Sequence, residues 1–137
     1  MRNKNLYSIL WAVMALLAAA LACNVFNTTP GASNFYMAKD EQGQNRTTTF
    51  APTDDFFLFF DVNAIEPSTK FQARWYGLDL EGQDPNTPVK TMDYTYEEGA
   101  SKLYFQLSPL ENWPAGNYKV EVYMNNVKAG EQAFRVQ

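Results

Sequence analysis

Histidine is absent from this sequence of 137 residues, and cysteine occurs once, at position 23. These absences exclude Ser-His-Asp and Cys-His nucleophilic sites, and also the zinc, haem and copper sites that depend on imidazole or thiolate ligands. Only carboxylate chemistry and metals bound through oxygen remain available to the chain. We therefore expect neither an enzyme nor a bound cofactor.

Basic side chains are also scarce: 11 Lys and Arg stand against 15 Asp and Glu. Arg2 and Lys4 lie in the first few residues, so the chain beyond residue 22 carries nine basic and 15 acidic side chains, a net charge of −6. Nucleic-acid binding and attraction to anionic lipid heads both need a basic face. We expect neither kind of binding.

The single cysteine follows an N-terminal secretory signal. Arg2 and Lys4 supply its positive start, residues 6–21 are almost wholly apolar, and Ala20-Leu21-Ala22 places small residues where a signal peptidase reads. Cys23 has no possible disulfide partner within the chain, so its position at the cleavage point needs another reason. A lipoprotein signal over residues 1–22, with a diacylglycerol on Cys23, supplies that reason.

Two other interpretations of the same segment stay open. Ala20 stands where the usual lipobox has leucine, and the spacing of Ala20 and Ala22 also fits ordinary secretory cleavage at the same bond. The run from Leu6 to Ala22 has 17 residues, near the lower limit for an uncleaved anchor, which needs roughly 20. We favour lipidation, which predicts an exported protein held on the outer face of a bacterial membrane.

The rest of the chain predicts a tether and one domain. Residues 23–34 are expected to be the lipidated cysteine and a flexible tether, since this stretch is polar and contains Pro30-Gly31. From Phe35 to Gln137 apolar residues alternate with a period of two, typical of half-buried strands. The expected strands are 35–38, 47–50, 56–63, 70–77, 91–97, 103–107 and 118–124, with a last strand at Phe134 and Val136.

These strands predict an all-β domain, an antiparallel β-sandwich of seven or eight strands behind the N-terminal signal or anchor helix. Residues 56–63 are apolar on both faces at first, which indicates a central strand covered on both sides. Trp75 is expected in the core. The run 113–118 places a Pro/Gly turn before a strand, from which the Tyr118 hydroxyl can bond back across the corner. Asn125-Asn126 tolerates positive φ and predicts a tight turn.

Four segments resemble a family. They are Phe71-Gln-Ala-Arg-Trp75, Asp84-Pro-Asn86, the run from Trp113 to Tyr123 and Phe134-Arg-Val136. The chain from Phe35 onward resembles the uncharacterised lipoproteins of bacteria such as the Chloroflexi, which carry one immunoglobulin-like domain behind a lipobox. Asn126 stands where the family would have a hairpin glycine. The resemblance implies an immunoglobulin-like fold and an exported location, and it implies no activity.

Acidic residues supply the only candidates for metal binding or catalysis. A loop with the spacing to gather oxygen ligands around Ca²⁺ contains Asp79, Glu81, Asp84 and Asn86, although it lacks the pattern of an EF-hand. The adjacent pairs Asp54-Asp55 and Glu97-Glu98 supply the carboxylates that acid–base catalysis needs. Adjacent residues on a strand point to opposite faces, so we favour solvated acidic turns for all of these groups and predict no metal and no catalytic site.

Aromatic residues are the better candidates for a binding surface. One alternating set of Phe56, Phe57, Phe59 and Phe60 must be core, and the other is a candidate exposed strip. Tyrosine suits interfaces because it buries area while its hydroxyl stays hydrogen-bonded. The candidate surface tyrosines are Tyr76, Tyr94, Tyr96, Tyr104 and Tyr123.

Two classes of function follow from these features. The favoured class is a membrane-tethered, non-enzymatic binding module that contacts an envelope protein, for example as an accessory subunit of a complex. The alternative is an envelope carbohydrate-binding domain, less favourably a hydrolytic one, that uses tyrosine faces and carboxylates. Hydrolysis needs two carboxyl groups about 5–10 Å apart across a cleft, and a small sandwich offers little cleft.

Overall fold

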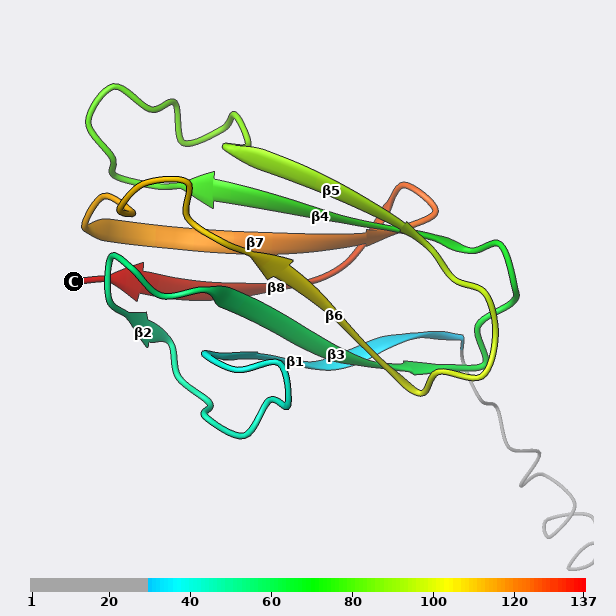
Figure 1. Cartoon of the computed structure of the whole chain (residues 1–137). Helices are drawn as coiled ribbons and strands as arrows, with labels where there is room; N and C mark the ends of the chain where they lie inside the picture. The colour runs from blue at the N-terminus through cyan, green and yellow to red at the C-terminus, as the bar shows by residue number, and fades with distance from the viewer. Residues whose placement is uncertain (1–29) are drawn as a thin grey trace, which may run out of the picture.

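The computed structural model describes residues 30–137, which form two β-sheets packed face to face (Figure 1). One sheet has the order β1-β3-β6, and the other has the order β2-β8-β7-β4-β5. The signal, Cys23 and most of the expected tether lie outside the described residues. The strands are β1 (Gly31–Ala38), β2 (Thr49–Phe50), β3 (Phe56–Asn63), β4 (Lys70–Gly77), β5 (Lys90–Thr95), β6 (Lys102–Leu107), β7 (Gly116–Met124) and β8 (Val127–Val136).

Two strands, β1 and β8, begin well before the residues at which the sequence pattern predicts them, whereas the other starts differ by at most two residues. β1 begins at Gly31 instead of Phe35, because Gly31, Ala32 and Ser33 pair with the end of β3 through their backbones. A register shift between Ser33 and Tyr36, with a positive φ of 54° at Asn34, interrupts the alternation that would have revealed this pairing. Residues 31–34 therefore belong to the sheet and not to the tether.

β8 begins at Val127, several residues before the apolar pair Phe134 and Val136. Its first half carries Gly130, where a Cβ would collide with the ring of Phe35. This half pairs with β7 across a register shift between Val122 and Tyr123 and shows no apolar alternation, which explains why the sequence pattern revealed only the end of β8.

The core lies between the sheets and is dominated by aromatic rings. Trp75 is buried, as predicted, and Phe56 lies at the centre of the cluster. The Phe56 ring centroid is 6.2 Å from that of Trp75, 4.7 Å from that of Trp113 and 4.8 Å from that of Phe134. Such aromatic contacts bury large areas, so the rings can hold the two sheets together without a disulfide.

The outer face of β3 is covered as well, which confirms the predicted central strand. Phe57 and Phe59 are buried in a second cluster, and the ring of Tyr36 stacks on Phe59 with centroids 5.1 Å apart. Gly43, in the connection after β1, lies against the same rings, where a Cβ would be 2.7 Å from the Tyr36 hydroxyl. The candidate exposed strip is therefore wrong: all four phenylalanines of β3 are buried.

Both predicted turns are confirmed. The Tyr118 hydroxyl donates a hydrogen bond to the Pro114 carbonyl at 2.6 Å, which ties the start of β7 to the turn before it. Asn125 and Asn126 have φ of 47° and 67° and connect β7 to β8. The Asn125 backbone amide donates to the Lys70 carbonyl, and its side-chain oxygen accepts from the Lys70 amide at 2.9 Å, so the turn is also joined to β4.

Candidate functional site

The structure separates the five predicted surface tyrosines. Tyr76 and Tyr96 are buried, and the Tyr96 hydroxyl donates to the Ala100 carbonyl at 2.9 Å. Tyr123 is half-buried. Only Tyr94 and Tyr104, with 41 % and 42 % of their surface exposed, present rings to solvent. The prediction of a surface position is therefore wrong for Tyr76 and Tyr96, because alternation identifies a face of a strand and not how fully its neighbours cover that face.

Cations cover two of these rings on the outer face of the five-stranded sheet. The Arg74 guanidinium lies 3.9 Å from the ring centroid of Tyr123, and the Lys119 ammonium lies 5.0 Å from that of Tyr76. These contacts are cation–π interactions within the domain. A ligand would have to displace the cations before it could stack on these tyrosines.

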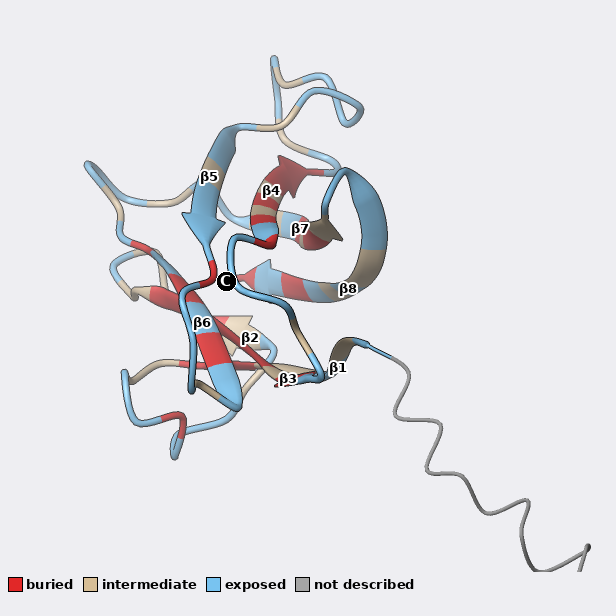
Figure 2. Cartoon of the chain, turned by 90° about the vertical axis from the view of Figure 1, so that its right-hand side faces the viewer, coloured by how far each residue is buried: buried red, intermediate tan, exposed pale blue. Residues whose placement is uncertain are grey.

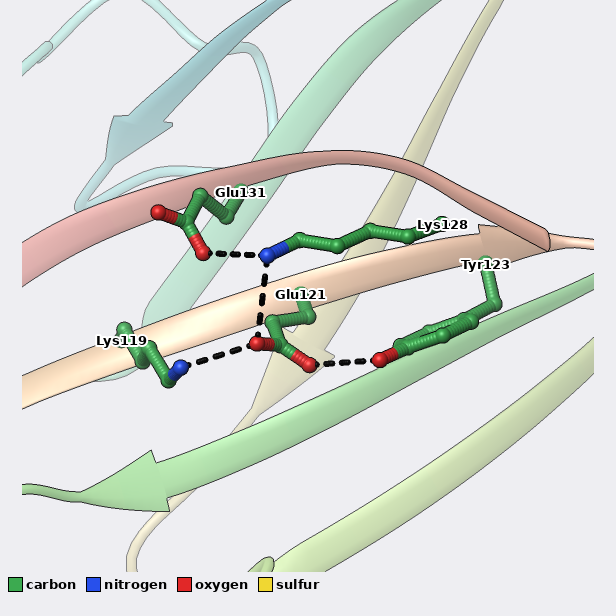
Figure 3. Close-up of polar contacts among 5 residues, drawn as sticks. All are labelled: Lys119, Glu121, Tyr123, Lys128 and Glu131. Carbon is green, nitrogen blue, oxygen red and sulfur yellow. Dashed lines mark hydrogen bonds and ion pairs between the residues drawn. The ribbon is translucent and has the colours of Figure 1, made fainter. Parts of the chain in front are cut away.

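Glu121 holds this outer face together (Figure 3). Its carboxylate accepts hydrogen bonds from Lys119 at 2.8 Å, from the Tyr123 hydroxyl at 2.8 Å and from Lys128 at 3.3 Å. Burial alone would raise the pKa of Glu121, but these three donors outweigh it and lower that pKa to about 2. Every group in the cluster is thus matched within the domain, and the cluster serves structure.

The two exposed tyrosines line one hollow, beside the edges of β5 and β6. This tyrosine hollow has a volume of about 360 Å³ and is lined by Tyr94, Lys102, Leu103, Tyr104 and Phe105. The Tyr104 hydroxyl donates to Glu41 at 2.7 Å, which raises the pKa of Tyr104. Its ring also lies 5.3 Å from that of Phe59, so Tyr104 is fixed while Tyr94 has no hydrogen-bond partner within residues 30–137.

A second hollow lies further along the same two strands, where β5 begins and β6 ends. This tip hollow has a volume of about 440 Å³. Its lining includes the apolar residues Val89, Leu107, Leu110, Trp113 and Pro114 and the charged residues Lys90 and Glu111. Trp113 is fixed: its indole N–H donates to the Asp54 carbonyl at 3.0 Å, and its ring stacks on Phe56. Leu110 beside it is fully exposed.

Sequence reasoning did not single out the tip hollow. Leu110 stands alone between polar and turn residues, without the alternating partners that mark a strand. Such an isolated apolar residue in a loop is the only signal that would have found it, and single exposed leucines are common on protein surfaces.

The candidate calcium-binding loop uses its carboxylates for its own structure. Asp79 accepts hydrogen bonds from the Asn117 backbone and side-chain amides at 2.6 and 2.7 Å. Asp84 accepts from the Asn86 amide at 2.9 Å and from the Thr87 hydroxyl at 3.0 Å. The same donors lower the pKa of both carboxyl groups. Glu81 joins no cluster, and residues 30–137 contain no group of three or more acidic side chains placed to hold a metal.

The candidate catalytic pairs are no better placed. Asp54 accepts from Lys39 and from the Ala51 amide, both at 2.7 Å, and these bonds lower its pKa. It therefore joins the turn before β3 to the end of β1 while Asp55 stands apart from these bonds. Glu97 and Glu98 are exposed in the connection between β5 and β6. Neither pair lines the tyrosine hollow or the tip hollow described above.

The arrangement of the two sheets is similar to that of solved structures, although the sequence matches no known family. No protein-family model matches the chain, and no curated protein matches it in sequence. An immunoglobulin-like protein from Pseudomonas aeruginosa superposes with a TM-score of 0.55 over 77 % of this chain and 93 % of its own, at 12 % identity. The fold is an immunoglobulin-like β-sandwich.

A second solved structure agrees at the level of the fold. The alkylpurine DNA glycosylase AlkC of Pseudomonas fluorescens superposes with a TM-score of 0.52 over 80 % of this chain, at 10 % identity, and the match covers 31 % of the glycosylase. Both identities are so low that the likeness concerns the fold alone. The resemblance to Chloroflexi lipoproteins stays a prediction. Within residues 30–137 no helix has the length and apolar character to cross a membrane.

Proposed function

We propose that this chain is an exported, non-enzymatic binding module that is anchored through a lipid on Cys23 and binds a protein of the cell envelope at the tip hollow. The immunoglobulin-like sandwich supports the proposal as a scaffold, since such sandwiches present loops at their ends. The absence of histidine and the structural use of Asp54, Asp79 and Asp84 support a role without catalysis.

The observation that carries the proposal is the fully exposed side chain of Leu110 beside the fixed ring of Trp113. An apolar side chain gains free energy when a partner removes it from water, roughly 25 cal/mol per Å². Tryptophan is also one of the residue types enriched in interaction hot spots, so the fixed ring of Trp113 suits a binding surface. Val89 extends the same apolar surface.

The position of the tip hollow suits a tethered protein. Figure 1 shows the loop after β4 and the loop after β6 at the end that carries the C-terminus, opposite the end at which β1 begins. Eight steps of chain from Cys23 to Gly31 span at most about 30 Å. An anchor at Cys23 would therefore keep the start of β1 near the membrane and direct the tip hollow away from it.

A carbohydrate ligand is less well supported. Stacking on a sugar needs a free aromatic face, and cations cover the rings of Tyr36, Tyr76 and Tyr123. Tyr94 and Tyr104 keep exposed faces, but they border a hollow lined by Leu103 and Phe105, which give a sugar few hydrogen-bonding partners.

Affinity purification from native membranes in mild detergent tests the proposal. The tagged chain and Val127→Ser should retain one protein in near-stoichiometric amount, whereas Leu110→Ser should lose it. Val127 is a matched control because it is another exposed apolar residue, next to the hairpin at the opposite end of the sandwich. Retention of the partner by Leu110→Ser, or recovery of the chain alone, would contradict the assignment. The intact mass of the same sample tests the anchor, which an unmodified N-terminus at Cys23 would overturn.

A further inference from the structure

β5 ends the five-stranded sheet and leaves one side of its backbone unpaired. The Tyr96 amide donates to the Thr69 carbonyl at 2.8 Å, so Tyr96 faces β4. In an antiparallel ladder the direction of the N–H and C=O groups alternates along the strand. The backbone groups of Thr91, Asp93 and Thr95 therefore point away from β4, toward solvent. Figure 2 shows β5 as exposed along most of its length.

Apart from its charged residues Lys90 and Asp93, this edge lacks the features that protect sheet edges from pairing. At the opposite side of the sheet, β2 has only two residues. In the other sheet, a register shift interrupts β1. Backbone hydrogen bonds from Lys39 to Asn45 and from Thr47 to Met37 also occupy backbone groups at the end of this strand. β5 has six residues in unbroken register with β4, contains no proline, and has no covering hydrogen bond from any other part of residues 30–137.

The charges along β5 are complementary to those of a second, antiparallel copy. Lys90 begins the strand, and Glu97 and Glu98 follow its end. An antiparallel partner with the same sequence places each Lys90 against the acidic end of the other copy. β6, whose outer edge is also unpaired, carries Lys102 as its only charge and has no such match.

We propose that two copies of this chain pair through β5, antiparallel, and join their five-stranded sheets into one continuous sheet. The inference goes beyond the envelope partner proposed above and does not depend on it. Tyr94 also favours the pairing, because its exposed ring lies on the free edge and would be covered by the second copy.

The outward backbone groups restrict the register. A pairing centred on Asp93 places two carboxylates directly opposite each other, which is destabilising. A pairing centred on Met92 leaves Glu97 and Glu98 without a partner. The pairing centred on Tyr94 sets Lys90 against Glu98, Asp93 against Thr95, and the two Tyr94 rings against each other at a pair without backbone hydrogen bonds, where side chains lie closest.

A proline at position 93 tests whether two copies pair through the outer edge of β5. The Asp93 amide faces outward, so Asp93→Pro leaves the ladder with β4 intact while removing one inter-copy hydrogen bond from each chain. In native mass spectrometry of the full chain in mild detergent, the wild type should be dimeric, and Asp93→Pro should weaken association about thirtyfold. Asp93→Ala, which keeps the amide, should remain dimeric. A monomeric wild type, or an Asp93→Pro dimer as stable as the wild-type dimer, would overturn the proposal.

Cysteine scanning tests the register. Position 94 faces itself across the proposed two-fold axis, so Tyr94→Cys should form a covalent dimer under mild oxidation. Tyr104→Cys is the matched control, because Tyr104 is equally exposed but lies on β6. Cys23 is common to both variants, so any cross-link through it appears in both. Equal cross-linking of the two variants would contradict pairing through β5.

Discussion

Glu121 shows how a charge can be part of a sheet surface without being a functional site. It is only 7 % exposed although it points to the outer face of the sheet, because Lys119, Lys128 and Tyr123 lie over it. An acidic group with a strongly lowered pKa often marks a functional site. Here the donors that lower the pKa lie on the neighbouring strands β7 and β8. The lowered pKa of Glu121 therefore indicates a contribution to the stability of the sheet and not a functional site.

The lowered pKa predicts acid sensitivity. The folded-state pKa of Glu121 is about 2, against an ordinary value of 4.5. Its stabilising contribution, about 3 kcal/mol at most, is therefore complete above pH 4.5 and is lost as the pH falls toward 2. In denaturant titrations Glu121→Gln should be clearly less stable than the wild type at pH 7, and the difference should shrink by pH 3.

Glu131→Gln is the control for that experiment. Glu131 bonds to Lys128 alone and its side chain is half exposed, so its removal should change the free energy of unfolding by less than about 1 kcal/mol at either pH. A difference for Glu121→Gln that stays constant between pH 7 and pH 3 would show that the carboxylate charge is not its source.

Tyr118 provides a second prediction for a single residue. Tyr118→Phe keeps the buried ring but leaves the Pro114 carbonyl without its hydrogen bond. We expect a loss of about 1–2 kcal/mol in the free energy of unfolding, measured by denaturant titration. Tyr104→Phe removes an exposed hydroxyl whose partner is Glu41 and should cost less. Equal losses in the two variants would show that the hydrogen bond from Tyr118 to Pro114 contributes no more to stability than the exposed bond of Tyr104.

At the scale of the element, the hairpin between β7 and β8 fixes a register through two asparagines with different roles. Both residues have positive φ, which glycine adopts more easily than asparagine. Only Asn125 also bonds to β4 through its backbone and side chain. The turn therefore joins three neighbouring strands, and this connection depends on Asn125 alone.

The two positions should respond differently to the same substitution. Asn126→Gly should leave stability unchanged or raise it by a few tenths of a kcal/mol, because it relieves the positive φ. Asn125→Gly should lower the free energy of unfolding by about 1 kcal/mol, because the Lys70 amide loses its acceptor. Thermal denaturation of the two variants under one condition makes the comparison, and a larger loss for Asn126→Gly would contradict it.

The same scale shows what the sequence could and could not predict. The observed bounds of β3 and β4 agree with the sequence prediction, because burial on one face leaves a period of two in β4, and burial on both faces leaves a continuous apolar run in β3. The first residues of β1 and the first half of β8 were missed, because a register shift and Gly130 remove that period.

The candidate site was harder to predict for a related reason. Tyr94 and Tyr104 were identified, but the hollow between them depends on how the edges of two different sheets approach each other. The tip hollow needs Leu110 and Trp113 to meet Val89, from another part of the chain. Periodicity describes one strand at a time and carries no information about such contacts.

At the scale of the whole molecule, an aromatic core holds the two sheets together, and residues 30–137 contain no cysteine that could form a disulfide. The lipid proposed on Cys23 would attach the protein to the membrane, and it would not contribute to the stability of the folded domain. The two properties are expected to be separable.

Cys23→Ser tests that separation. We expect the variant to leave the membrane fraction, because a single serine cannot carry a diacylglycerol, while its thermal denaturation midpoint stays equal to that of the wild type. Fractionation of cells followed by immunoblotting measures the first effect. A wild-type protein whose intact mass still includes residues 1–22 would indicate a retained helix in place of a lipid anchor.

The position of β8 determines when the domain can fold. β8 lies between β2 and β7, and its pairing with β2 joins Phe50 to Val136 across most of the domain. A nascent chain synthesised only as far as Met124 lacks this strand, so neither the sheet nor its aromatic face can close. Contacts so distant along the sequence also slow folding. The five-stranded sheet therefore stays incomplete until β8 has been synthesised.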